Sequence, residues 1–190
     1  MADRFNESRV PLAYLITFRC YGTWLHGDER GSIDRRHNAY GSGLIPPDER
    51  WRRHNARSLK YEAVELDAAR RDAIEAALRE TCAFRKWLLR AVNARTNHVH
   101  AVVSAGCRPE TVLRDFKAYA TRLMRERGCW LHDYSPWSEG GSRRYLWTER
   151  SVELAVEYVV ECQGGPLPDF NQYRERERAG STCQYTDESG

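Results

Sequence analysis

The spacing of hydrophobic residues divides the chain into a few strands and helices. Residues 12–21 (LAYLITFRCY) are rich in β-branched and aromatic types, which predicts a strand that ends at Gly22. A second apolar run covers residues 87–92, and a third covers residues 98–103. The turn-forming sequence NARTN separates these two runs, so together they predict a hairpin.

Apolar residues recur at helical spacing in three further segments. The predicted helices cover residues 67–85, 109–127 and 151–163. Asp67 and Ser151 are candidate N-caps, Pro109 suits a first helical position, and Gly128 suits a helix end. These signals place the three helices after the first strand, after the hairpin and near the end of the chain.

Glycine-rich and polar segments are expected to form loops. Residues 22–58 and 132–146 contain the clearest breakers and predict two long loops, and the polar tail 171–190 is expected to be flexible. The remaining order of strand, helix, hairpin, helix and helix predicts an α+β fold with an antiparallel sheet. We expect one domain over residues 1–170.

Charge and composition narrow the function only slightly. The net charge of +3 is small, but only three of the 30 basic residues are lysines, and the others are arginines. Guanidinium groups bind phosphate and stack on bases, although a GC-rich genome produces the same bias. No apolar run approaches the roughly 20 residues of a membrane helix, and the polar start MADRFNESRV does not resemble a signal peptide. These features predict a cytoplasmic protein that does not bind membranes.

The sequence Asn97-His98-Val99-His100 is the clearest candidate for chemistry. Residues two apart on a strand face the same side, so His98 and His100 are expected to lie together. Two imidazoles at this spacing can hold one divalent metal ion. Because such pairs also arise by chance, the hypothesis requires a third ligand and a reactive group.

The last predicted helix, SVELAVEYVVECQGG, offers a reactive group in Tyr158. Its apolar stripe is formed by Val152, Val156 and Val159, and Tyr158 lies roughly opposite at about 100° per residue. A tyrosine aimed at a metal-bound phosphate can attack it and form a covalent intermediate. Tyr119 is the rival nucleophile, but it lies in phase with the apolar residues of its own helix and is expected in the core.

These motifs resemble the single-tyrosine HUH transposases, which include small insertion-sequence transposases and REP-associated tyrosine transposases. The family has a His-hydrophobic-His pair on a central strand, and later a helix with one tyrosine followed by an amide side chain. NHVH matches the first pattern and EYVVECQG the second. The stretches TFRCYGTWLHGDERGSIDR, KAYATRLMRE and GGSRRYLW are also similar to segments of the family, so the resemblance spans about residues 12–168.

The resemblance implies a ferredoxin-like or RRM-like antiparallel sheet with helices packed on one face. It implies that His98, His100 and a third ligand from the tyrosine helix hold Mg²⁺ or Mn²⁺, which polarises a DNA phosphate. Tyr158 would attack that phosphate, giving a 5′-phosphotyrosine and a free 3′-hydroxyl, and the 3′-hydroxyl of a second strand would rejoin it. The expected partner is single-stranded DNA, with hairpin ends of the protein's own element, and relatives act as monomers or homodimers.

One departure from the family pattern concerns the third ligand. The family's amide lies four residues after the tyrosine, where this chain has Cys162, and Gln163 follows one residue later. On an ideal helix Gln163 lies about 140° from Tyr158. Either the helix unwinds at the glycine pair 164–165 and Gln163 turns back, which we favour, or Glu161 is the ligand. Imidazole ligands suit Mn²⁺ better than Mg²⁺, so the metal stays open.

Several aromatic and cationic residues are candidates for contacts with DNA. The candidates are Trp24, His26, Lys117, Arg122, Arg143 and Arg144. Trp24 lies in a glycine-rich loop with His26, where its ring can stack on a base. Arg143 and Arg144 follow two glycines and can clamp a phosphate. Each of these residues also fits an ordinary solvated surface.

Two other functions compete with this hypothesis. A non-catalytic module that binds single-stranded nucleic acid, either RRM-like or a domesticated transposase, requires exposed aromatic residues on its sheet. The histidine pair counts against that alternative. A two-histidine phosphoesterase requires two separate His-x-Ser/Thr motifs, and the sequence contains neither.

Overall fold

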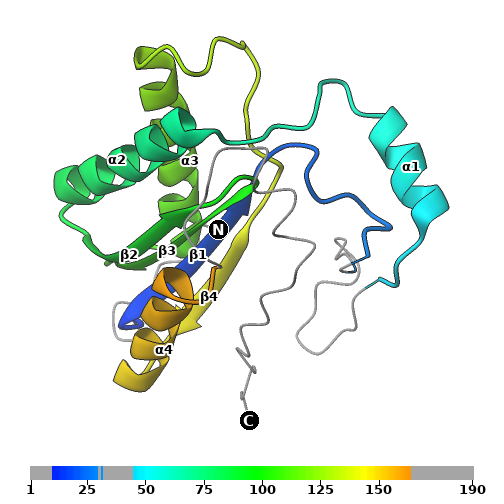
Figure 1. Cartoon of the computed structure of the whole chain (residues 1–190). Helices are drawn as coiled ribbons and strands as arrows, with labels where there is room; N and C mark the ends of the chain where they lie inside the picture. Colours follow the sequence, from blue (N-terminus) through cyan, green and yellow to red (C-terminus); the bar gives the residue numbers. More distant parts are fainter. Residues whose placement is uncertain (1–9, 30, 32–44, 164–190) are drawn as a thin grey trace, which may run out of the picture.

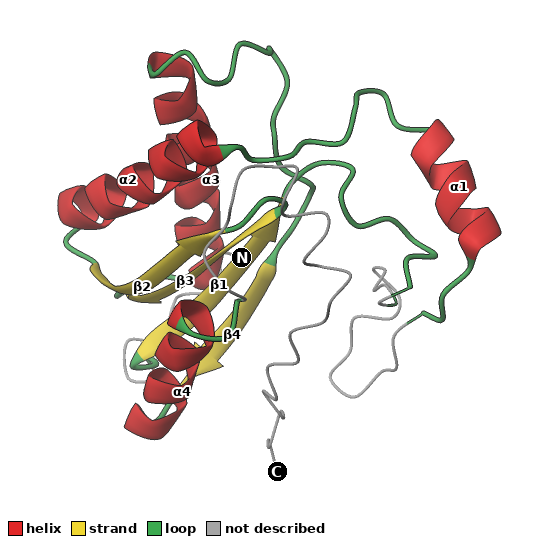
Figure 2. Cartoon of the chain, viewed as in Figure 1, coloured by secondary structure: helices red, strands yellow, loops and turns green. Residues whose placement is uncertain are grey.

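The computed structural model describes residues 10–29, 31 and 45–163, so the expected tail 171–190 lies outside the described residues. Its elements are β1 (Ala13–Arg19), α1 (Glu49–Arg57), α2 (Ala68–Arg85), β2 (Leu88–Ala94), β3 (His98–Ser104), α3 (Pro109–Glu126), β4 (Ser142–Leu146) and α4 (Glu149–Val160). The strands form one antiparallel sheet in the order β2-β3-β1-β4 (Figure 2). With α2 and α3 between the strands, this is a ferredoxin-like arrangement. The predicted α+β fold is therefore confirmed.

The two faces of the sheet are covered by different helices. Alternate residues of the central strands pack with α2 and α3 in the larger core, among them Tyr14, Ile16, Phe18, Val99, Ala101 and Val103. The intervening residues Ala13, Leu15 and Val102 pack instead against α4. In Figure 1, α4 accordingly lies across the sheet from α2 and α3. The expectation that all helices pack on one face is wrong for α4, because its apolar stripe covers the second face.

The ends of α2 and α3 follow the predicted signals, whereas α4 begins earlier than predicted. Thr148, and not Ser151, is the N-cap of α4. The Thr148 hydroxyl accepts from the backbone N–H of Ser151 (3.1 Å), and the Ser151 hydroxyl accepts from the backbone N–H of Thr148 (3.2 Å). This reciprocal pair satisfies two donors that a helix start leaves without partners. The buried stripe contains Ala155 between its two valines, and Val156 is only half-buried.

Two elements lie where the sequence predicted loops. β4 (Ser142–Leu146) is an edge strand in which only Leu146 is buried, so it lacks the alternation that marks a half-buried strand. α1 (Glu49–Arg57) buries no residue at all, so it has no apolar stripe to reveal it. Its start is fixed by Asp48, whose side chain accepts from the backbone N–H groups of Arg50 and Trp51. Among the described residues, no helix combines the length and apolar character needed to cross a bilayer.

The cap of α4 gives a prediction about stability. Thr148→Ala removes the hydroxyl that accepts from Ser151 and is expected to lower the free energy of unfolding by about 1 kcal/mol. Urea unfolding followed by circular dichroism measures the change. Thr111→Ala, inside α3, is the matched control and is expected to change stability by less than about 0.5 kcal/mol. Equal losses in the two variants would show that the cap adds nothing.

Candidate active site

A cavity of about 260 Å³ opens on the face of the sheet that α4 covers only in part. Its lining residues are Thr17, Arg19, Thr23, Trp24, Asn97, His98, His100, Tyr158 and Gln163. The structure therefore brings together both histidines, the candidate nucleophile, the favoured third ligand and Trp24. They come from β1, the loop after β1, β3 and the end of α4, so the fold and not the local sequence assembles the group.

Strand pairing fixes the positions of the two histidines. In the register of β1 and β3, Thr17 lies opposite His100 and Arg19 lies opposite His98. Residues opposite one another in an antiparallel pair share a face, and Val99, between the histidines, is fully buried in the other face. The two imidazole rings are 4.6 Å apart between centroids. Adjacent strands thus supply two ring nitrogens, one hydroxyl and one guanidinium to the same cavity.

His100 is held neutral by its surroundings. Its side chain is buried, and its Nδ1 lies 2.7 Å from the hydroxyl of Thr17. Burial, followed by the charges of His98 and Arg19, lowers the pKa of His100 to about 3. An imidazole that stays neutral keeps a lone pair for a metal ion. When Nδ1 donates its proton to Thr17, that lone pair is on Nε2.

The end of α4 is fastened beside the histidine strand. The side-chain amide of Asn93, opposite His100 in the sheet register, donates to the backbone carbonyl of Val159 (2.9 Å). One residue earlier on the helix, the Tyr158 ring meets the His100 ring edge-on, with 5.3 Å between centroids. Tyr158 is half-buried at the border of the α4 core, and not opposite it as the helical spacing predicted.

Gln163 reaches the histidines because α4 ends early. The helix stops at Val160, before the glycine pair at which we expected it to unwind. Past the helix end, the Gln163 amide nitrogen donates to the backbone carbonyl of Tyr158 (3.0 Å). This bond turns the amide oxygen toward His98, 3.5 Å from Nε2. Glu161 is exposed and does not line the cavity, so of the two candidate third ligands only Gln163 lies at the histidine pair.

The donor atoms fit a divalent cation. His98 Nδ1 lies 2.5 Å from the side-chain oxygen of Asn97, and because an amide oxygen only accepts, Nδ1 carries the proton. Nε2 of His98 and the amide oxygen of Gln163 lie next to each other, and both are atoms that bind divalent metal ions. Within the described part of the chain, no three His, Cys, Asp or Glu side chains gather into a metal group.

Thr17, Arg19 and Thr23 line the cavity although the sequence did not mark them as candidates, and Arg19 is the charged residue among them. Its guanidinium carbon lies 3.1 Å from the centroid of the Trp24 ring, and the Trp24 indole N–H donates to the carbonyl of Gly31 (2.7 Å). One face of Trp24 is therefore covered by Arg19, which leaves less of the ring for stacking on a base than we expected. The available signal was strand alternation, which puts Arg19 on the same face as Thr17.

The other predicted DNA contacts do not line the cavity. His26 stacks on Trp51 of α1, with ring centroids 5.2 Å apart. Arg143 pairs with Glu110 (3.0 Å) on the opposite face of the sheet. Arg144 lies on the histidine side of β4, since it pairs with Leu15, but it is not a lining residue.

The α3 candidates are also remote from the histidines, because α3 covers the other face. The Lys117 ammonium donates to the backbone carbonyls of Ser138 and Gly140, and burial lowers its pKa. The Arg122 guanidinium lies 4.9 Å from the centroid of the Tyr119 ring. Tyr119, the rival nucleophile, is half-buried on α3 and does not line the cavity.

Comparisons with known proteins identify no family. No protein-family model matches the chain, and a search of curated proteins finds no significant match. Among solved structures, the chain is similar to one described as a REP-associated tyrosine transposase bound to a REP hairpin. The TM-score is 0.43 with 10% sequence identity, over 84% of this chain and 70% of that chain. A likeness at this level assigns neither a family nor a function.

The environment of His100 predicts how the protein responds to acid. Its folded-state pKa, about 3, lies below the ordinary value of 6.5, so the unfolded chain binds the proton more readily. His100 therefore lowers the stability of the fold as pH falls from about 6.5 toward 3. In metal-free protein, the NMR resonances of the His100 ring are expected not to titrate between pH 8 and 5.

The variant His100→Asn tests the same point through stability. Its free energy of unfolding is expected to depend less on pH than that of the parent in this range, because the titrating group is absent. A His100 titration midpoint near 6 in the parent protein would show that the ring is not buried and neutral as described.

Proposed function

We propose that the chain is a metal-dependent transposase that nicks and rejoins single-stranded DNA through Tyr158. The observation that carries the proposal is the convergence of His98, His100, Gln163 and Tyr158 on one cavity. The two imidazoles and the amide oxygen beside them are groups that bind divalent metal ions, which supports their role as ligands. Tyr158 contacts His100 edge-on, so its phenol ring lies next to the proposed metal ligands.

Most of the lining side chains have a task in this proposal. His98 Nε2, His100 Nε2 and the Gln163 amide oxygen would hold Mg²⁺ or Mn²⁺, which would polarise the scissile phosphate. Asn97 and Thr17 orient the two imidazoles by binding their Nδ1 atoms. Mn²⁺ suits this nitrogen-rich ligand set better than Mg²⁺.

Tyr158 supplies the covalent chemistry. Its phenolic oxygen loses its proton and forms a bond to phosphorus, and the bond from phosphorus to the 3′ oxygen breaks. The products are a 5′-phosphotyrosine and a free 3′-hydroxyl. In the second step the 3′-hydroxyl of another strand attacks the same phosphorus and Tyr158 leaves. The phosphotyrosine linkage conserves the energy of the broken phosphodiester bond, so rejoining needs no nucleotide cofactor.

Arg19 adds a positive charge to the lining. Its guanidinium lies against the Trp24 ring, and a guanidinium is the side chain best suited to bind phosphate oxygens. We propose that Arg19 binds a non-bridging oxygen of the scissile or a neighbouring phosphate. Charge-assisted bonds of this kind stabilise the extra negative charge that develops during transfer.

A non-catalytic module of the RRM type receives less support from the same face. Such modules stack bases on aromatic residues of the central strands. Here the corresponding face of β1 and β3 has Thr17, Arg19, His98 and His100, and α4 covers the rest. DNA binding without cleavage is therefore the less favoured alternative, and the covalent-capture experiment below distinguishes it from catalysis.

Covalent capture tests the proposed nucleophile. Purified protein, Mn²⁺ or Mg²⁺ and a labelled hairpin DNA with a single-stranded extension, from the flanks of its own gene, are expected to give a denaturation-resistant adduct. Tyr158→Phe is expected to abolish the adduct, because it removes the attacking oxygen, and His100→Ala is expected to abolish it by removing a ligand. A denaturing gel measures both.

Tyr119→Phe is the matched control, since it makes the same change on the opposite side of the sheet. It is expected to leave the adduct intact. Loss of the adduct in Tyr119→Phe alone would show that Tyr158 is the wrong tyrosine. Binding of every flank sequence without any adduct would favour a binding module.

Metal titration tests the third ligand independently of catalysis. Mn²⁺ binding, measured by calorimetry on Tyr158→Phe protein, is expected to weaken roughly 10- to 100-fold in Gln163→Ala, by analogy with the loss of other metal-site partners. Glu161→Ala is the matched control at the same helix end and is expected to bind Mn²⁺ like its parent. The reverse result would move the third ligand to Glu161.

A further inference from the structure

Helix α1 is held in place by the same loop that carries Trp24 into the cavity. Two residues after Trp24, the His26 ring stacks on Trp51 of α1, and the His26 carbonyl accepts from the Asn55 side chain (3.1 Å). The carbonyl of Gly27 accepts from the backbone N–H of Asp48, the N-cap (3.0 Å). In Figure 1, α1 stands apart from the other helices. Its described contacts are with the loop and not with the sheet.

Gly27 allows this close approach. Its φ of +89° is a conformation that side chains disfavour, and a Cβ there would lie 2.2 Å from the Asp48 carbonyl oxygen and 2.7 Å from Arg52 N. The position of α1 beside the cavity loop therefore depends on a glycine at this point.

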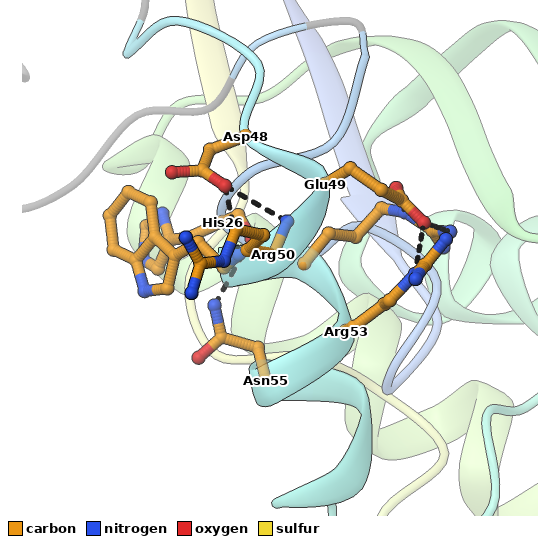
Figure 3. A network of polar contacts seen from close by, with 8 residues as sticks. His26, Asp48, Glu49, Arg50, Arg53 and Asn55 are labelled. Carbon is orange, nitrogen blue, oxygen red and sulfur yellow. Dashed lines mark hydrogen bonds and ion pairs between the residues drawn. The ribbon is translucent and has the colours of Figure 1, made fainter.

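The exposed surface of α1 carries a row of arginines at helical spacing. At about 100° per residue, Arg50, Arg53 and Arg57 fall within an arc of about 60°, far from Trp51 and Asn55 on the docked side. In Figure 3, Arg53 and Glu49 point away from His26 and Asn55, whereas the Arg50 side chain extends toward the His26 side. All three arginines are exposed, and the row is about 10 Å long.

Among the described residues, the carboxylates near α1 gather around Arg52: Glu49, together with Asp28 and Glu29 of the loop, raises its pKa. The helix contains four arginines and one glutamate. Glu49 binds both Arg52 (2.6 Å) and Arg53 (2.8 Å), so one carboxylate is shared by two guanidinium groups. Asp48 is engaged by the backbone at the helix start. A nine-residue helix that buries nothing is marginal alone, and repulsion among like charges weakens it further, so an anionic partner would stabilise it.

We infer that α1 and its loop form a phosphate-binding arm, in which Arg50, Arg53 and Arg57 hold the backbone of the DNA strand that leads into the cavity. The charge of the row and its spacing along the helix match successive backbone phosphates better than a compact anion. The inference rests on the proposed function only for the identity of the cavity's substrate. The arm would guide the DNA strand into the cavity, because the loop that holds α1 also carries Trp24 of the cavity lining.

The test measures DNA binding without cleavage. Tyr158→Phe protein without metal is titrated into the labelled hairpin DNA with a single-stranded extension, and fluorescence anisotropy is followed at several salt concentrations. The triple variant Arg50→Gln, Arg53→Gln, Arg57→Gln keeps good helix-forming residues. Its affinity at low salt is expected to fall at least roughly tenfold. The slope of log affinity against log salt is expected to fall by about two to three, because each arginine that no longer binds a phosphate lowers the slope by about one.

A matched triple variant controls for net charge. Arg79, Arg127 and Arg150 are exposed and each pairs with a carboxylate on another surface of the protein. Their replacement by glutamine is expected to change the affinity less than about twofold. Gly27→Ala retains every arginine but displaces α1, and is expected to weaken binding as well. Circular dichroism and urea midpoints establish that all variants are folded.

The outcomes separate the arm from the catalytic proposal. Equal losses in the two triple variants, unchanged affinity in the α1 triple, or unchanged affinity in Gly27→Ala would each overturn the arm. Absence of DNA binding by the parent protein would overturn it too. If the α1 triple loses affinity while Tyr158 forms no adduct with metal, the arm stands and the catalytic proposal fails.

Discussion

The antiparallel pairing of β1 with β3 is the constraint on which the site depends. It sets His100 opposite Thr17 and His98 opposite Arg19, while Phe18 and Val99 point into the core under α2 and α3. A slip of one residue would exchange the two faces. It would expose Phe18, which is fully buried, and burial of such a side chain contributes about 1.5–3 kcal/mol. The apolar core therefore holds the register, and the register gathers the polar side chains.

The length of α4 determines where the sheet stays open. Its buried stripe covers Ala13, Leu15 and Val102 and ends with Val159, so Thr17, Arg19 and the two histidines line a cavity beyond it. Asn93 fastens the last turn to the sheet, and the chain then leaves helical geometry within a few residues. An uninterrupted helix would carry Gln163 away from His98. The early helix end is thus as much a part of the site as the histidine strand.

Elements with a buried face could be predicted from the sequence, and elements without one could not. α2 and β3 follow their apolar patterns closely. β4 and α1 form through backbone pairing and capping, which leave little trace in residue type. Strand alternation put His98 and His100 on one face, and the motif resemblance added Tyr158; the structure brings all three to one cavity, and their chemical roles stay predictions. Alternation also puts Arg19 on the face of Thr17, but its place beside His98 follows from the pairing of β1 with β3, which local sequence does not give.

Cationic residues show the same limit most clearly. Lys117 and Arg143 resemble any surface cation in the sequence, yet the first is satisfied by two backbone carbonyls and the second by Glu110. Arg50 and Arg57 looked like part of a polar loop, yet helix formation puts them in one row. The cations of the two groups differ in how many hydrogen-bond acceptors lie near them, and this depends on the fold. A guanidinium whose neighbours already neutralise it has less to gain from DNA. Of the α1 row, Arg53 shares Glu49 with Arg52, so a bound phosphate would add negative charge where the helix has fewer carboxylates than arginines.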